Sequence, residues 1–125
     1  MSTVLIVDDD PAFTHLVAMV LQDEGFRAWQ ASDGEQALKI LEVEQPDLIL
    51  LDLNMPNMDG RSLYKSSRAR GYKGPVVIVS AIGAERASAD LGADGALEKP
   101  FDINELVSRV NGALGIQPGE AWLKR

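Results

Sequence analysis

Short apolar runs alternate along this chain of 125 residues with longer stretches in which apolar residues recur every three or four positions. Uninterrupted runs of this kind are typical of strands buried on both faces of a parallel sheet. The three-to-four spacing instead indicates helices with one buried face. The runs predict five strands, of which the second and the fifth are the weakest: residues 3–7, 27–31, 48–51, 76–79 and 95–98.

Helix signals follow each predicted strand. Asp10 is a good N-cap for the first helix, the pair Ser32 and Glu35 has the spacing of a capping box for the second, and Asp102 caps the last. The predicted helices are 11–24, a segment from about 33 to 44, about 61–70, 84–91, and one that starts at 103. The apolar stripe of the first helix is Phe13, Leu16, Val17, Val20 and Leu21, and that of the last is Ile103, Leu106, Val107, Val110 and Leu114.

Five strand–helix units in a row predict an α/β fold, a doubly wound parallel sheet with helices on both faces. The length suits one domain, which we assign to residues 1–115, with 116–125 as a C-terminal tail or the start of a linker. This tail contains Trp122 and follows the last apolar stripe.

Composition narrows the possible functions. The 19 acidic and 12 basic side chains leave a net charge of −7, which argues against binding to nucleic acid or to anionic membranes. The chain has no cysteine, so disulfides, thiolate metal sites and cysteine nucleophiles are excluded. Because the first predicted strand begins at residue 3 and no apolar run approaches membrane-spanning length, we expect a cytoplasmic protein.

Three carboxylates stand where predicted strands end. Asp8 and Asp9 follow the first strand, and Asp52 ends the third. Ligands of open α/β sheets bind beyond the carboxyl ends of the strands, and Ser80 and Lys99 follow the fourth and fifth strands there. If the first and third strands are neighbours, the like charges need a cation or a proton to offset their repulsion. The pattern therefore favours a site over a set of unrelated polar strand ends.

Four motifs carry these residues: V-L-I-V-D-D-D-P, L-L-D-L-N-M-P-N-M-D-G, V-I-V-S-A and L-E-K-P-F. Together, and in this order, they resemble the receiver domain of two-component response regulators, of which the bacterial chemotaxis regulator is a single-domain example. The resemblance implies a flavodoxin-like fold with strand order 2-1-3-4-5. It also implies a signalling domain, with no enzymatic activity beyond its own phosphorylation and autodephosphorylation.

The resemblance assigns a role to each site residue. Asp52 would be the phosphoacceptor, taking a phosphoryl group from the phosphohistidine of a sensor kinase or a histidine phosphotransfer protein. Asp8, Asp9 and Asp52, with the backbone carbonyl of Asn54, would hold Mg²⁺, for which Mn²⁺ can substitute. Lys99 would pair with the phosphoryl group. The resemblance further implies a hydrogen bond from Ser80 to a phosphoryl oxygen, a cis peptide between Lys99 and Pro100, and a downstream protein partner that the sequence does not name.

Two departures from the family concern the switch. The family has an aromatic residue or histidine three positions before the lysine, where this chain has Ala96. Ser80 and Lys99 are 99 − 80 = 19 positions apart, about three fewer than in typical relatives, which is nearly one helical turn. We therefore expect a shortened fourth helix. We also expect phosphorylation to be read through the loop at 80–83 or the first-helix face.

Other interpretations remain. A phosphorylation-independent interaction module could keep the same fold, and Ala96 leaves this open. A phosphatase of the haloacid dehalogenase type would need an acid two positions after Asp52, where Asn54 stands. The basic run from Arg61 to Lys73, which holds five cations and no acid, is interpreted as a solvated face. The helix face that carries His15 is either a solvated face or a face that docks a partner.

Overall fold

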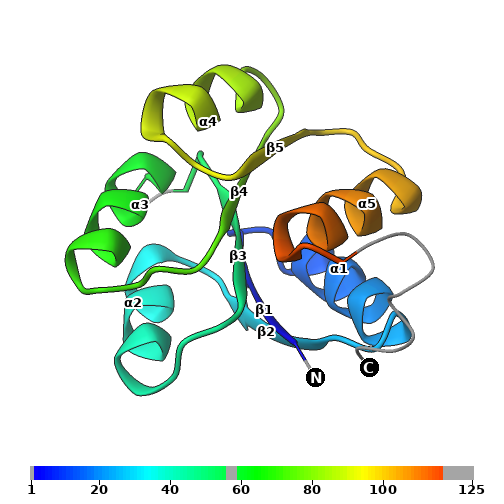
Figure 1. The fold of residues 1–125 in the computed structure, drawn as a ribbon, viewed down its shortest axis with the longest axis horizontal. Helices are drawn as coiled ribbons and strands as arrows, with labels where there is room; N and C mark the ends of the chain where they lie inside the picture. The colour runs from blue at the N-terminus through cyan, green and yellow to red at the C-terminus, as the bar shows by residue number, and fades with distance from the viewer. Residues whose placement is uncertain (1, 56–58, 117–125) are drawn as a thin grey trace.

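The described part of the chain forms five parallel strands that alternate with five helices (Figure 1). The computed structural model describes residues 2–55 and 59–116, so the proposed tail lies, except for Ile116, outside the described residues. The strands are β1 (Thr3–Val7), β2 (Arg27–Ala31), β3 (Leu48–Asp52), β4 (Val76–Ser80) and β5 (Gly95–Glu98). The helices are α1 (Pro11–Asp23), α2 (Gly34–Val43), α3 (Gly60–Ala69), α4 (Ala84–Leu91) and α5 (Ile103–Leu114).

The sheet has the order β2-β1-β3-β4-β5, which confirms the predicted doubly wound, flavodoxin-like fold. Helices α1 and α5 cover one face, and α2, α3 and α4 cover the other (Figure 1). Every residue of β1, β3 and β4 is buried, whereas the edge strand β2 carries exposed positions. This difference explains why the three inner strands have continuous apolar sequences.

Side chains that alternate along each inner strand enter two separate cores. Leu5 and Leu51 pack with the helices on the α2 side, whereas Ile6 and Leu50 pack with α1 and α5. Because the strands are parallel and in register, with Val7 opposite Leu51, their carboxyl ends reach the same edge. Among the described residues, none of the helices combines the length and the apolar character needed to cross a membrane.

The observed N-cap residues agree with the caps predicted from the sequence for two helices and differ for one. Asp10 and Asp102 accept hydrogen bonds from the first turns of α1 and α5, as predicted. The cap of α2 is not Ser32: Asp33 accepts from the backbone N–H of Gln36 at 2.8 Å. The Gln36 side chain in turn accepts from the N–H of Ser32 at 2.9 Å. Asp33 and Gln36 therefore have the spacing of a capping box one position later than Ser32–Glu35, although the Gln36 side chain accepts from the N–H of Ser32, the residue before the N-cap.

The apolar stripes of α1 and α5 are wider than the faces that these helices bury. Leu16 and Ile103 are each 58% exposed, so their predicted place in the core is wrong. Both line a groove of about 320 Å³ between α1 and α5, which also holds Phe13 and Phe101. They lie at the flank of each helix, where the spacing of the stripe is kept but the sheet no longer covers it.

Helix α4 has eight residues, which confirms the predicted shortening. Glycines with positive φ flank it: Gly83 at 77° and Gly92 at 74°. Ala84 and Ala87 on this helix are buried in the same cluster as Ala96 on β5. The methyl side chain of Ala96 therefore lies in a close-packed contact between α4 and β5. Helix α4 and strand β5 would have to move apart to hold an aromatic ring there.

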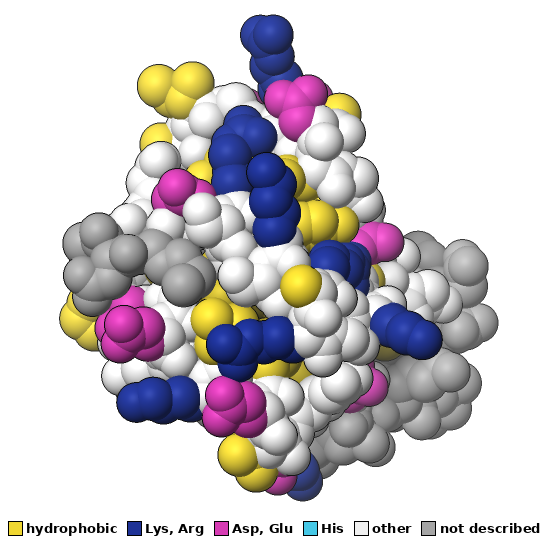
Figure 2. Space-filling view, turned by 90° about the vertical axis from the view of Figure 1, so that its left-hand side faces the viewer, with side chains coloured by type: hydrophobic (Ala, Val, Ile, Leu, Met, Phe, Trp, Pro, Cys, Tyr) yellow, Lys and Arg dark blue, Asp and Glu magenta, His cyan; other side chains and the backbone are white. Residues whose placement is uncertain are grey.

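The basic run lies on and after α3. Figure 2 shows lysine and arginine side chains gathered on the face that carries α3. Arg70 pairs with Glu42 at 3.0 Å, and Arg68 lies over the rings of Tyr64 and Tyr72 while donating to two carbonyl groups. Arg61, Lys65 and Lys73 are exposed, which agrees with a solvated face.

Candidate functional site

The three acids predicted to meet do so at the carboxyl end of the sheet. Asp8 and Asp9 follow β1, Asp52 ends the neighbouring β3, and one carboxylate oxygen from each lies within 4.8 Å of the others. Asp8 is 1% exposed and Asp52 is 6% exposed, while Asp9 faces solvent. Two buried carboxylates at this separation repel each other strongly, because little water screens them.

Lys99 offsets part of this charge. Its Nζ donates to Oδ2 of Asp8 at 2.7 Å, across 91 positions of sequence. The other oxygen of Asp8 accepts from the backbone N–H of Asp10 at 3.0 Å. Lys99 follows β5, whose partner β4 fixes it by a hydrogen bond from its N–H to the carbonyl of Ser80 at 2.8 Å. The peptide bond after Lys99 is cis, as the family resemblance implied.

Asp52 is the less compensated of the two buried carboxylates. Its Oδ1 accepts one long hydrogen bond, 3.4 Å from the N–H of Asn54. Burial raises the pKa of Asp52, the charge of Asp8 raises it further, and Lys99 lowers it. The Asp52 carboxylate is therefore the group that gains most from an additional cation or from conversion to a different chemical form.

The donor set fits a small, hard divalent cation. Carboxylate oxygens are the ligands that Mg²⁺ uses in proteins, typically one or two of them together with water and phosphate oxygens. Asp9 and Asp52 have oxygens available for this, whereas Asp8 already holds Lys99. Asn54 lies two positions after Asp52 and is exposed, and a role for its backbone carbonyl stays a prediction.

Ser80 ends β4 on the same edge, and its hydroxyl is hydrogen-bonded to the loop that follows. Its hydroxyl donates to the carbonyl of Ile82 at 3.0 Å and accepts from the N–H of Ile82 at 3.3 Å. The next residue, Gly83, donates its N–H to the carboxylate of Glu98 at 3.0 Å. The loop between β4 and α4 is thus held from both sides, by the predicted hydroxyl and by a carboxylate that no sequence signal had singled out.

The sequence pattern did not assign two further residues, Phe13 and Gly60, to the site. Phe13, predicted only as core, lies beneath Lys99, with Nζ 4.2 Å from the ring centroid. Gly60 begins α3 so close to β3 that a Cβ there would be 2.4 Å from the carbonyl oxygen of Asp52. Its N–H donates to the carbonyl of Leu53 at 2.8 Å. The glycine after Asp59 was visible in the sequence, but only the tertiary contact reveals why a side chain is not accommodated.

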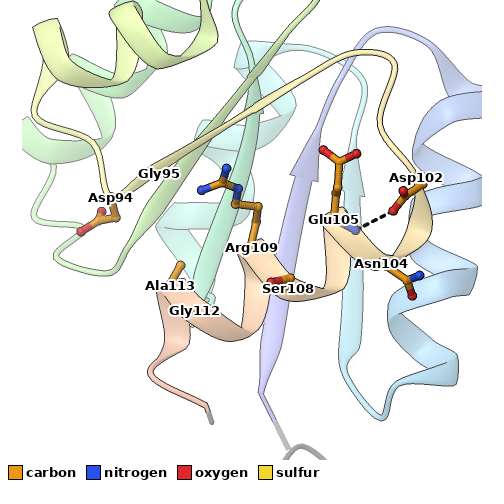
Figure 3. Close-up of a pocket in the computed structure, with 9 residues that line it drawn as sticks. All are labelled: Asp94, Gly95, Asp102, Asn104, Glu105, Ser108, Arg109, Gly112 and Ala113. Atoms are coloured by element: carbon orange, nitrogen blue, oxygen red, sulfur yellow. Dashed lines mark hydrogen bonds between the residues drawn. The ribbon is translucent and has the colours of Figure 1, made fainter. Parts of the chain in front are cut away.

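A separate polar pocket of about 550 Å³ lies on the β5–α5 side of the molecule. Figure 3 shows that its lining comes from α5 and from the turn that enters β5. Arg109 lies in it beside acids that include Asp94 and Glu105. It shares no residue with the acidic cluster, so it is not part of the candidate site.

Comparison with known proteins agrees with this geometry. Residues 4–111 match the model of the response regulator receiver domain. The chain is 41% identical over 117 residues to the transcriptional regulatory protein CpxR of Escherichia coli, covering 91% of this chain and 50% of CpxR. It is 37% identical over 114 residues to the alkaline phosphatase synthesis transcriptional regulatory protein PhoP of Bacillus subtilis, covering 89% of this chain and 48% of PhoP. The chain thus spans about half the length of these relatives.

Solved structures give the same answer. The chemotaxis protein CheY4 of Vibrio cholerae superposes with a TM-score of 0.84 at 30% identity, covering 91% of this chain and 99% of CheY4. The receiver domain of NtrX from Brucella abortus superposes with a TM-score of 0.83, also at 30% identity, covering 91% of this chain and 99% of that domain. The matched residues, the strand order and the acidic edge of the sheet together show that the chain belongs to the family of response regulator receiver domains, the phosphoacceptor domains of two-component signalling.

Proposed function

We propose that Asp52 is the residue that receives the phosphoryl group. The observation that carries this is its position: a buried carboxylate at the end of β3, within 4.8 Å of two other acids and near the Asp8–Lys99 ion pair. An Asp52 oxygen attacks phosphorus, the P–N bond of a phosphohistidine breaks, and its electron pair stays on the imidazole nitrogen. Such a transfer needs positioning and charge compensation more than covalent chemistry.

The neighbouring residues supply that compensation. Asp9 and Asp52, with the backbone carbonyl of Asn54, would hold Mg²⁺, and Asp8 would contribute through its charge and through bound water. When bound, the ion neutralises charge on the phosphoryl oxygens. Lys99, which donates to Asp8, supplies a second positive charge.

The partner that fits this role is a sensor histidine kinase or a histidine phosphotransfer protein in the cytoplasm. The return to the resting state would be hydrolysis of the aspartyl phosphate by water at the same site. We further propose residues 1–115 as the receiver and 116–125 as a tail or linker. CpxR and PhoP are by name transcriptional regulators, so an output function outside this receiver domain is part of the proposal.

Labelling tests the acceptor. The protein is incubated with Mg²⁺ and acetyl phosphate, and added phosphate is located by mass spectrometry. We expect one phosphate on Asp52 in the wild type and none in Asp52→Asn. Asp23→Asn, which removes an exposed carboxylate at the end of α1, is the matched control and should label like the wild type. Full labelling of Asp52→Asn would refute the assignment.

The phosphoryl group would be sensed through the β4–α4 loop. For Ser80 to donate to a phosphoryl oxygen, its hydroxyl must leave the carbonyl of Ile82, and Gly83 remains tied to Glu98 unless that bond also opens. Since Ala96 has no ring to move, we propose that the rearrangement is confined to this loop and the start of α4.

Hydrogen exchange with and without a phosphoryl mimic, in the presence of Mg²⁺, tests this proposal. Protection should change over residues 53–60 and 80–90 and change little over 95–97. A large change centred on β5 and α5 would contradict it. An absence of change at any position in protein saturated with the mimic would favour the second candidate, a module that binds its partner regardless of phosphorylation and uses the alanine-packed α4–β5 contact.

A further inference from the structure

Lys99 has two kinds of partner. Its ammonium group donates to Asp8 at 2.7 Å, and it lies 4.2 Å from the centroid of the Phe13 ring. The Lys99 side chain is 27% exposed, so water only partly screens both contacts. A cation at this distance from a ring is attracted to the negative face of the π-system.

Phe13 makes two contacts besides the one to Lys99, one through its backbone and one through its ring. The backbone N–H of Phe13 donates to the capping carboxylate of Asp10 at 3.3 Å, which anchors the residue in the first turn of α1. The ring meets Phe101 edge to face, with centroids 5.8 Å apart and an interplanar angle of 79°. Such T-shaped pairs are favourable because the positive edge of one ring meets the negative face of another. Phe13 therefore has contacts of its own besides the one to Lys99.

We propose that Phe13 is a positioning residue for Lys99 in phosphoryl transfer. In the resting site the ammonium group is held by Asp8, whereas in the reaction it must face the phosphoryl oxygens on Asp52. A hydrogen bond to Asp8 is directional and weakens as the ammonium turns, whereas attraction to the ring requires only that the charge stay over the ring face. The ring thus keeps the cation at the edge of the site while its hydrogen bonds are exchanged. This inference rests on the proposed function of Asp52.

A purely apolar role for Phe13 makes a different prediction. The ring also borders the groove between α1 and α5, and a space-filling side chain could be replaced by leucine without affecting Lys99. The variants Phe13→Leu, which removes the ring, and Phe13→Tyr, which keeps it, separate the two roles. Phe101→Leu is the matched control, because it removes the ring partner of Phe13 and leaves the face beneath Lys99 in place.

The first measurement is the rate of labelling by acetyl phosphate at fixed Mg²⁺. Phe13→Leu should label about two- to fivefold more slowly than the wild type, the range that a partly exposed cation–π contact supplies. Phe13→Tyr should recover the wild-type rate, and Phe101→Leu should lose less than Phe13→Leu. In a Lys99→Met background the same Phe13→Leu substitution should have no further effect. A wild-type rate for Phe13→Leu, or an equal loss in the Lys99→Met background, would overturn the proposal.

The second measurement does not depend on labelling. Protons above a ring face are shifted upfield in NMR spectra, so the side-chain ε protons of Lys99 should be shifted upfield in the wild type, in Phe13→Tyr and in Phe101→Leu. The shift should disappear in Phe13→Leu. Its absence from the wild type would refute the contact itself. If instead the wild type shows the shift but does not label on Asp52, the proposed function fails, and with it the role of Phe13 in that reaction.

Discussion

Replacing Asp52 by asparagine should make the metal-free protein more stable. Asparagine has nearly the same shape and can still accept the hydrogen bond from the N–H of Asn54, so the change removes mainly one negative charge. Two unit charges 4.8 Å apart, the limit of the separation within this cluster, interact by about 1 kcal/mol in water and about 3.5 kcal/mol at an effective dielectric constant of about 20. Because Lys99 already offsets part of the repulsion, we expect a gain of about 1–3 kcal/mol near neutral pH.

The pH dependence of this gain has a defined sign. Burial and Asp8 raise the pKa of Asp52 in the folded protein, so ionisation of this carboxyl costs stability as the pH rises through that value. Below the pKa of the unfolded chain, the wild-type Asp52 is neutral in both states and resembles asparagine. The stability difference between the two proteins should therefore be largest near pH 7 and vanish in acid.

Chemical denaturation in a chelating buffer measures the effect, and Mg²⁺ should reduce the difference between the two proteins. A cation that binds only the folded protein stabilises it by about 2.7 kcal/mol at a concentration 100 times its dissociation constant. The wild type should gain most of this and Asp52→Asn much less. Asp23→Asn, with its carboxylate exposed on α1, should change neither value. If Asp52→Asn were no more stable than the wild type without metal, repulsion between Asp52 and its neighbouring acids would not destabilise the folded protein, and the reasoning would be refuted.

Three further outcomes are expected. Asp9→Ala should lose most of the rise in melting temperature that millimolar Mg²⁺ gives the wild type, and equal responses would exclude Asp9 as a ligand. Gly60→Ala should destabilise the fold by about 1–3 kcal/mol in urea denaturation, because its methyl group would overlap the backbone of Asp52. Gly112→Ala is its control, since nothing lies within 4 Å of that position in α5, and it should stabilise by about 0.5–1 kcal/mol. Asp102→Ala should cost about 1 kcal/mol through loss of the α5 cap, measured in the same way.

The sequence by itself determined the order of the elements and the edge at which the polar residues collect. Strands buried on both faces do not alternate apolar and polar residues, so the apolar runs in β1, β3 and β4 are continuous and easy to locate. Because these strands are parallel, acids that end them must share one edge of the sheet. The shortened α4 was predictable because the family resemblance implies about three more positions between Ser80 and Lys99 than the 19 of this chain. The roles of the site residues came from the family resemblance, and they stay predictions.

Only the tertiary structure decided which contacts each side chain makes. The spacing of apolar residues placed Leu16 and Ile103 in the core, but a helix flank beyond the sheet has no partner to bury it. The capping box shifted by one residue because serine and aspartate can both cap, and the local backbone selects between them. Phe13 reads as one more apolar position in α1, and its place beneath Lys99 depends on residues 86 positions apart in sequence (99 − 13 = 86). A periodic pattern records which face of an element is apolar, whereas contacts between distant elements depend on how the sheet brings them together.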